Sequence, residues 1–258
     1  MQSKTVQTRH APVRYLEGGA GEPLVFFHGA GGMTENDPIL AELSSRFHVY
    51  APFIPGYGET EECESMRDML DFALHGWDVV EALGLKNPIL VGHSMGGMIA
   101  AEMAALAPND VSRLALICPA GLWLDDHPIV DMFSLMPYEM PKYLFHDPEK
   151  GAAAMTSGLD MSDPKFLQTY LVRNARQLGM AGKLLFPIPD RGLAERLYRV
   201  KAKTVIVWGE SDKMIPPVYG PAFQKAIAGS KLVNVPEAGH MVVMEQPGAV
   251  LKAVESVA

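Results

Sequence analysis

The segment Pro88-Ile89-Leu90-Val91-Gly92-His93-Ser94-Met95-Gly96-Gly97 decides the fold of this chain. It opens with a short apolar run that predicts a buried strand, and the small residues from Met95 to Leu106 predict a helix that Pro108 ends. Between them, the pattern Gly-x-Ser-x-Gly matches a nucleophile elbow, a tight strand-to-helix turn that presents a serine hydroxyl. A side chain at position 92 or 96 would collide with the neighbouring chain. The segment therefore predicts that Ser94 is a nucleophile.

Short apolar runs alternate with helical stretches along most of the chain. Strands are expected at residues 23–27, 47–51, 88–91, 113–118, 204–208 and 231–235. Helices are expected at residues 66–83, with Gly84 capping the carboxyl end, at 95–106 and at 247–257. This alternation indicates an α/β fold with a mostly parallel sheet whose two faces are covered by helices.

The stretch from Pro119 to Leu193 breaks the alternation, because it has no convincing strand and its prolines divide it into several expected short helices. We call residues 119–193 the helical insertion. The simplest organisation is one α/β core of residues 1–118 and 194–258 that holds the helical insertion between two strands. Its residues 132–145 are rich in Met, Leu and aromatic side chains, including Phe133, Leu135, Tyr138, Tyr143 and Leu144. These side chains could pack the insertion onto the core, line an apolar pocket, or do both.

From about Val13 to Val257 the chain resembles the α/β-hydrolase fold superfamily, and within it the capped serine hydrolases such as carboxylesterases and carbon–carbon bond hydrolases. The resemblance implies an eight-stranded-type, mostly parallel sheet, a helical cap inserted in the core, and catalytic partners in the order serine, acid, histidine. Gly209-Glu210-Ser211-Asp212 resembles the family's acid loop, and Glu237-Ala238-Gly239-His240 resembles its histidine loop. Asp212 and His240 are the expected partners, with Glu210 and Glu237 as weaker alternatives for the acid.

The expected roles of these three residues follow from the chemistry of acyl transfer. A serine hydroxyl becomes an effective nucleophile when a neighbouring base takes its proton. His240 would take the proton of Ser94 and later give it to the leaving group. Asp212 would orient His240 and stabilise the imidazolium without becoming protonated itself.

A second loop resembles the family's oxyanion loop. His28-Gly29-Ala30-Gly31-Gly32 follows the first strong strand directly. The backbone N–H groups of Ala30 and Met95 would converge on the negative oxygen that develops during acyl transfer. His28 is expected to brace this loop and not to act as a second base.

The chain departs from relatives of the same fold at several positions. Ser94 stands where haloalkane dehalogenases and epoxide hydrolases have an aspartate nucleophile, which argues against both activities. Phe53 stands where the corresponding turn often begins with aspartate, and this puts local hydrogen bonding of the turn in doubt. Carbon–carbon bond hydrolases usually place tryptophan after the histidine, whereas this chain has Met241, and they use a cap arginine, for which Arg173 or Arg176 could serve.

The composition excludes several classes of protein without naming an activity. The chain has 258 residues, of which 48% are hydrophobic, and a formal net charge of −8. An acidic balance favours neither nucleic acid nor an anionic membrane surface as a partner. Two cysteines, Cys63 and Cys118, cannot form a disulfide framework, and no stretch is apolar enough to insert in a membrane. Because no signal pattern is recognised, a cytoplasmic location is expected, and nothing indicates an oligomeric state.

No cofactor or metal is expected. Asp125-Asp126-His127 together with Asp131 has no second histidine nearby, and it indicates a solvated loop. Gly29 to Gly32 lacks the spacing of a dinucleotide-binding loop.

The sequence as a whole predicts a serine hydrolase that cleaves small to medium, largely apolar carboxylic esters through an acyl-enzyme, with a small-molecule ester as its partner. The alternatives are a carbon–carbon bond hydrolase of ring-cleavage products and a lactonase. A hydrolase-fold ligand receptor is the alternative outside the enzymes, and multiple turnover of substrate would distinguish the two.

Overall fold

The structure, a computed structural model, describes residues 1–157, 160, 162–186 and 190–257. Its centre is an eight-stranded sheet with the strand order β1-β2-β4-β3-β5-β6-β7-β8. The strands are β1 (Gln2–Gln7), β2 (Pro12–Gly18), β3 (Pro23–Phe27), β4 (His48–Pro52), β5 (Ile89–His93), β6 (Arg113–Ile117), β7 (Lys203–Gly209) and β8 (Lys231–Val235). The pairs β1–β2 and β2–β4 are antiparallel, and the others are parallel. The predicted mostly parallel α/β sheet is confirmed.

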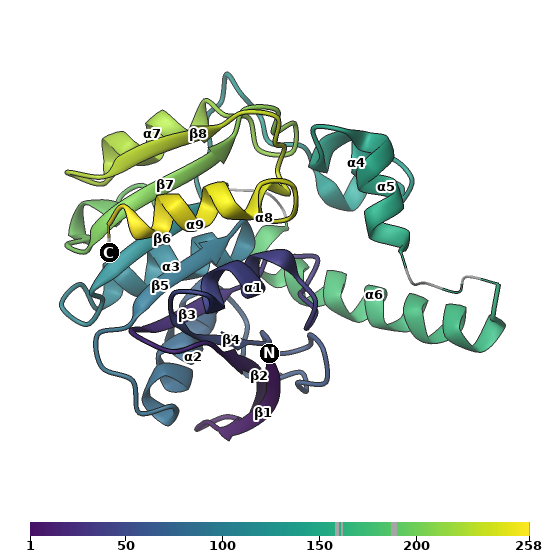
Figure 1. The fold of residues 1–258 in the computed structure, drawn as a ribbon, viewed down its shortest axis with the longest axis horizontal. Coiled ribbons are helices and arrows are strands. Elements are labelled where there is room, and N and C mark those ends of the chain that lie inside the picture. Colours follow the sequence, from purple (N-terminus) through teal and green to yellow (C-terminus); the bar gives the residue numbers. More distant parts are fainter. Residues whose placement is uncertain (158–159, 161, 187–189, 258) are drawn as a thin grey trace.

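Helices cover both faces of this sheet. The helices in the described part of the chain are α1 (Pro38–Ser44), α2 (Met69–Ala82), α3 (Met95–Leu106), α4 (Met140–Leu144), α5 (Pro148–Thr156), α6 (Pro164–Leu185), α7 (Tyr219–Ala226), α8 (Val242–Glu245) and α9 (Pro247–Glu255), with the short 3-10 helices η1 (Met132–Ser134) and η2 (Leu197–Arg199). α1 and α9 pack against each other on one face, and α2 and α3 pack against each other on the other (Figure 1). Among the helices that the structure describes, none combines the length and the apolarity needed to cross a bilayer.

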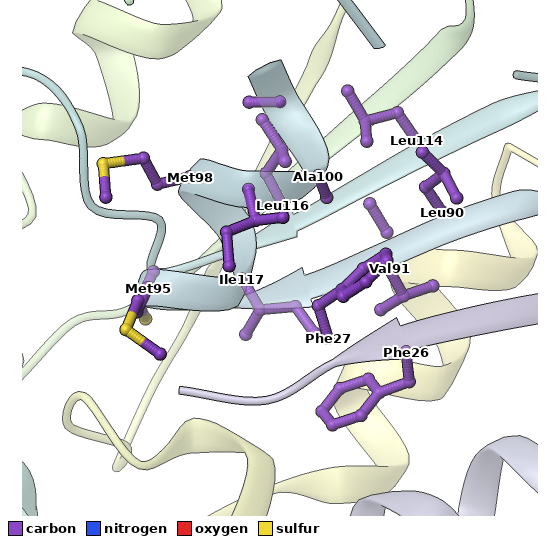
Figure 2. Close-up of a cluster of buried hydrophobic side chains, with 14 of the residues drawn as sticks. Phe26, Phe27, Leu90, Val91, Met95, Met98, Ala100, Leu114, Leu116 and Ile117 are labelled. Atoms are coloured by element: carbon purple, nitrogen blue, oxygen red, sulfur yellow. The ribbon is translucent and has the colours of Figure 1, made fainter. Parts of the chain in front are cut away.

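Buried apolar side chains surround the predicted elbow. Figure 2 shows side chains of β3, β5 and β6, among them Phe27, Val91 and Ile117, gathered with those of α3. All five residues of β5 are buried, as are all but the first residue of β6. Burial on both faces explains why these strands are continuous apolar runs without polar alternation. This packing fixes the carboxyl end of β5, where the chain turns into α3.

Capping residues set the ends of α2. The periodicity predicted a helix from residue 66, but α2 begins at Met69, because the carboxylate of Asp68 accepts hydrogen bonds from the N–H groups of Leu70 and Asp71. At the other end Gly84 has φ +68°, the left-handed conformation that glycine adopts most readily. The predicted carboxyl-terminal cap is therefore confirmed, and the predicted start was three residues too early.

Two features of the fold were not predicted. β1 and β2 form an antiparallel pair at the edge of the sheet, and β1 is exposed along most of its length, so it lacks the apolar signal of a buried strand. In the helical insertion, α4 and α5 are short, as expected, but α6 runs unbroken for 22 residues. No proline interrupts it after Pro164, which stands in its first turn, where proline is tolerated.

The helical insertion contains η1, α4, α5 and α6, which lie between β6 and β7 in the chain. Figure 1 shows α5 and the amino-terminal part of α6 projecting beyond the sheet and its covering helices. Towards the carboxyl end of α6, Met180, Ala181 and Leu184 are buried and join the core. The division into a core and a cap domain stays a prediction.

Candidate active site

Ser94 occupies a sharp turn between β5 and α3. Its φ of 53° and ψ of −116° are unusual for any residue with a side chain. The turn is held because Ser94 N–H donates to Ile117 O at 2.9 Å, and Ser94 O accepts from Met98 N–H at 3.1 Å. A Cβ added to Gly92 would strike the backbone of Gly96, and one added to Gly96 would strike Phe27 O. The backbone thus has the conformation that the elbow pattern requires.

The structure brings Ser94, His240 and Asp212 into one line of hydrogen bonds. His240 Nε2 lies 2.8 Å from Ser94 Oγ, and His240 Nδ1 lies 2.8 Å from Asp212 Oδ2. An ionised carboxylate can only accept, so Nδ1 holds the imidazole proton and Nε2 is left to accept from the serine hydroxyl. All three residues are less than a tenth exposed.

The carboxylate of Asp212 accepts hydrogen bonds at both of its oxygens. Its second oxygen, Oδ1, accepts from the N–H groups of Met214 at 2.9 Å and Ile215 at 2.8 Å. These bonds fix the orientation of the carboxylate. The two alternative acids, Glu210 and Glu237, are exposed, so the acid that contacts His240 in this structure is Asp212.

The predicted oxyanion loop lies directly against Ser94. A Cβ added to Gly29 would come within 3.3 Å of Ser94 Cβ. His28 Nδ1 lies 2.8 Å from Gly29 O, and His28 Nε2 accepts from Ile54 N–H at 3.1 Å, so this ring braces the loop as expected. Within the described part of the chain, the N–H groups of Ala30 and Met95 are found in no hydrogen bond to a protein acceptor. Both remain available to a ligand.

A model of the alpha/beta hydrolase family matches residues 24–253 of the chain. The chain belongs to this family.

Three known proteins illustrate the range of chemistry among similar hydrolases. Lipase 1 of Psychrobacter immobilis is 27% identical over 252 residues, covering 90% of this chain and 75% of the lipase. The 2-hydroxy-6-oxo-6-(2'-aminophenyl)hexa-2,4-dienoic acid hydrolase of Metapseudomonas resinovorans is 26% identical, covering 91% of this chain and 83% of that enzyme. The crystal structure of naproxen esterase from Bacillus subtilis has a TM-score of 0.74 at 21% identity, covering 99% of this chain and 90% of the esterase. At that identity the structural likeness shows the fold alone.

His93, which sequence reasoning did not single out, holds the histidine loop of this hydrolase. His93 Nε2 lies 2.9 Å from the main-chain oxygen of His240, so Nε2 is the donor of that hydrogen bond. Burial, together with the neighbouring His240, lowers the pKa of His93 to about 3. Burial likewise lowers the pKa of His28 to about 4. Both rings are therefore neutral near pH 7, which suits a bracing role and excludes a role as a cation.

Glu245, the last residue of α8, joins the histidine loop to the helical insertion. Its two carboxylate oxygens accept from Gly239 N–H at 2.7 Å and from His146 N–H at 2.9 Å. In addition, Met241 N–H donates to Leu144 O at 2.9 Å. The two bonds to the insertion join residues about 100 positions apart through backbone atoms of the partner, so no sequence pattern indicates them. They place the insertion directly beside His240.

Cys118 lies close to Asp212 and His240, and one potential ligand atom from each of the three lies within 4.8 Å of the other two. Metals bind the thiolate form of cysteine. Burial and then the charge of Asp212 raise the pKa of the Cys118 thiol well above its usual range. Both nitrogens of His240 also have protein partners already. The group is better suited to a hydrolase site than to a metal centre.

Other residues singled out in the sequence lie outside this line of hydrogen bonds. Arg176 donates to Glu62 Oε1 at 3.1 Å and to Thr60 O at 2.9 Å, and Arg173 lies over the ring of Tyr170. In the loop after β6, the carboxylate of Asp125 accepts from Trp123 Nε1 at 3.0 Å. The structure shows none of these charged groups in contact with Ser94 or His240.

Proposed function

We propose that this protein is a serine hydrolase that cleaves small to medium, largely apolar carboxylic esters through an acyl-enzyme. The observation that supports the proposal most strongly is the line of two hydrogen bonds from Asp212 through His240 to Ser94, both 2.8 Å long. A buried serine with φ at 53° costs strain, and such strain is typical of functional sites.

The proposed reaction has two halves, the formation of the acyl-enzyme and its hydrolysis, and His240 transfers a proton in each. His240 Nε2 takes the proton of Ser94 Oγ as that oxygen attacks the ester carbonyl, and the N–H groups of Ala30 and Met95 stabilise the resulting oxyanion. His240 then gives the proton to the leaving alcohol, and the acyl group stays on Ser94. His240 then takes a proton from a water molecule, which attacks the acyl-enzyme, and returns that proton to Ser94 Oγ as the acid is released.

The choice of apolar esters rests on the helical insertion, which we propose forms a cap over Ser94. Its side chains Phe133, Leu135, Tyr143 and Leu144 are half-buried against the core, whereas Tyr138 is 79% exposed. The insertion also contacts the histidine loop through Leu144 and His146. An apolar cover excludes water from the reacting ester and accommodates acyl or aryl groups.

The test is a panel of aryl esters with graded acyl length, assayed with the wild type and with Ser94→Ala. The wild type is expected to turn over repeatedly, and the variant to lose activity by a factor on the order of 10⁴ or more. Ser45→Ala, at an exposed serine after α1, is the matched control and should behave as the wild type. Equal activity of Ser94→Ala and wild type would contradict the proposal, and binding without turnover would favour a ligand receptor.

A carbon–carbon bond hydrolase is the second candidate, because the hexadienoic acid hydrolase is similar over 91% of this chain. Lactone hydrolysis is a close variant of the proposed ester hydrolysis. Including a ring-cleavage dienone and a lactone in the panel distinguishes these substrates. A preference for the dienone by several orders of magnitude would replace the ester assignment.

A further inference from the structure

Tyr57 lies between the oxyanion loop and the helical insertion. It belongs to the turn after β4, and its side chain is fully buried. Its hydroxyl oxygen lies 3.0 Å from Ala30 O and 3.0 Å from Gln177 O. Ala30 is in the oxyanion loop, and Gln177 is in α6. One phenol thus touches two segments that are far apart in the chain.

The hydroxyl can satisfy these carbonyl oxygens only as a donor. A carbonyl oxygen accepts, so a phenolate would repel both of them. Burial raises the pKa of Tyr57 far above its usual range, which keeps the phenol protonated. The single proton is shared between the two acceptors, so the position of each acceptor affects the bond to the other.

The bond from Tyr57 to Ala30 O fixes one of the two peptide planes beside the Ala30 N–H, the predicted oxyanion donor. The N–H of Ala30 belongs to the peptide plane whose oxygen, Gly29 O, is held by His28 Nδ1 at 2.8 Å and by Gly32 N–H at 3.0 Å. The next plane contains Ala30 O, which Tyr57 holds. The His28 and Tyr57 rings also pack together, with centroids 4.7 Å apart. The two planes that flank Ala30 are therefore fixed by two different side chains.

The turn of α6 that contains Gln177 also contacts the loop that contains Tyr57. Arg176, the residue before Gln177, donates to Thr60 O and pairs with Glu62. Met180, one turn later, packs so closely on Gly56 that a Cβ at Gly56 would overlap its side chain. These contacts hold α6 against the turn that contains the buried Tyr57 ring. If α6 moved away, the ring would become exposed, and its hold on Ala30 O would loosen.

We propose that Tyr57 is a positioning residue that couples the docking of α6 to the alignment of the Ala30 N–H with Ser94. This inference rests on the proposed function, since it takes the Ala30 N–H to be an oxyanion donor. It makes the reactivity of Ser94 depend on a residue that contacts neither Ser94 nor His240.

The test compares Tyr57→Phe with Tyr219→Phe. Tyr219 is also fully buried, and its hydroxyl donates to His127 O at 2.8 Å and accepts from Leu124 N–H at 3.0 Å, so the control loses a comparable hydroxyl outside the oxyanion loop. The readouts are kcat and KM for an aryl ester and the rate at which a fluorophosphonate labels Ser94. Labelling forms a bond from phosphorus to serine oxygen and expels fluoride while His240 takes the proton, so it needs no knowledge of the natural substrate.

Tyr57→Phe is expected to slow labelling and kcat roughly tenfold with KM changed less than about twofold, because the donor is still present but poorly aligned. Tyr219→Phe should label at the wild-type rate. Equal labelling of Tyr57→Phe and wild type would overturn the Tyr57 proposal and leave the proposed function intact. A wild type that does not label at all would overturn both.

A second variant tests the coupling to α6. Arg176→Gln removes the bonds to Thr60 and Glu62 and should itself slow labelling by roughly threefold, because a loosened α6 frees the Tyr57 ring. The effect of Tyr57→Phe should then be smaller in this background than in the wild type. Strictly multiplicative effects would overturn the coupling. If Tyr57→Phe does not fold, Arg176→Gln alone tests the coupling, and labelling of that variant at the wild-type rate would overturn it.

Discussion

His93 Nε2 donates a hydrogen bond to the main-chain oxygen of His240 across 2.9 Å, so the residue before the proposed nucleophile holds the backbone of the proposed base. The two rings lie with centroids 5.2 Å apart. The distance between Ser94 and His240 is therefore set by the contact of His93 with the His240 backbone as well as by the side chains of Ser94 and His240 themselves.

Replacing His93 by phenylalanine should damage both stability and turnover. The His240 oxygen would lose its donor inside the protein, which costs about 1–3 kcal/mol in the free energy of unfolding. A less constrained histidine loop should also lower kcat roughly tenfold with little change in KM. Urea unfolding and steady-state kinetics of the variant measure both effects. A variant with wild-type stability and kcat would show that this bond is dispensable.

Asp212→Asn should retain the fold and lose turnover by about four orders of magnitude, because an amide favours the wrong tautomer of the histidine and cannot stabilise its cation. Glu210→Gln, at an exposed carboxylate in the same loop, is the control and should be nearly neutral. Circular dichroism and ester turnover of both variants check the prediction. The reverse order of damage would mean that the acid has been assigned to the wrong residue.

Gly96→Ala should be strongly destabilising, by about 3 kcal/mol or more, because its Cβ would collide with the backbone carbonyls of Phe27 and His28. Gly182→Ala is the control and should have the opposite effect on stability. A Cβ at Gly182 in α6 would meet no atom within 4 Å beyond its chain neighbours and the backbone of its own helix. That variant should gain roughly 0.5–1 kcal/mol from its higher helix propensity. The free energy of unfolding in urea measures both changes.

His75 should make the protein sensitive to acid. It is buried, and neither ring nitrogen has a hydrogen-bond partner among the described residues. Burial lowers the pKa of His75 to about 4, while Asp78 opposes the shift and His10 adds to it. In the unfolded chain the pKa is about 6.5, so the unfolded state binds the proton first and stability falls as pH drops from about 6.5 to 4.

His75→Leu should therefore resist acid better than the wild type. Between pH 7 and pH 5 the wild type should lose about 2 kcal/mol more than the variant in its free energy of unfolding. Urea titrations at the two pH values measure this difference. His28 and His93 contribute a similar loss in both proteins, so parallel pH dependence of variant and wild type would rule out a contribution from His75.

The sequence predicted those parts of the fold and site that short local patterns specify. The elbow at Ser94 needs only a strand, two glycines and a helix, and α3 covers the predicted residues, Met95–Leu106. The loops that contain Asp212 and His240 follow strands β7 and β8, as expected. Their meeting with Ser94 depends on the parallel arrangement of β5, β6, β7 and β8, which the alternation of strands and helices also predicted.

The residues that sequence reasoning missed act through contacts between distant segments. Tyr57 contacts Gln177, and Glu245 contacts His146, in both cases through main-chain atoms of the partner. Backbone acceptors and donors have no residue type, so no pattern of letters indicates them. β1 was missed for a different reason, because an exposed edge strand needs little apolar surface.

Two sets of contacts anchor the part of the helical insertion between Leu144 and Met180 to the rest of the protein. Leu144 and His146 hold one end against the histidine loop, and Arg176 and Met180 hold the other against the turn at Tyr57. Apart from Gly151, the described residues of α5 and the first half of α6 are at least partly exposed. Under the proposed cap role, exchange of α5 and the first half of α6 should change which substrates the protein admits. Chimeras that keep both anchors should still label at Ser94 while their substrate range differs.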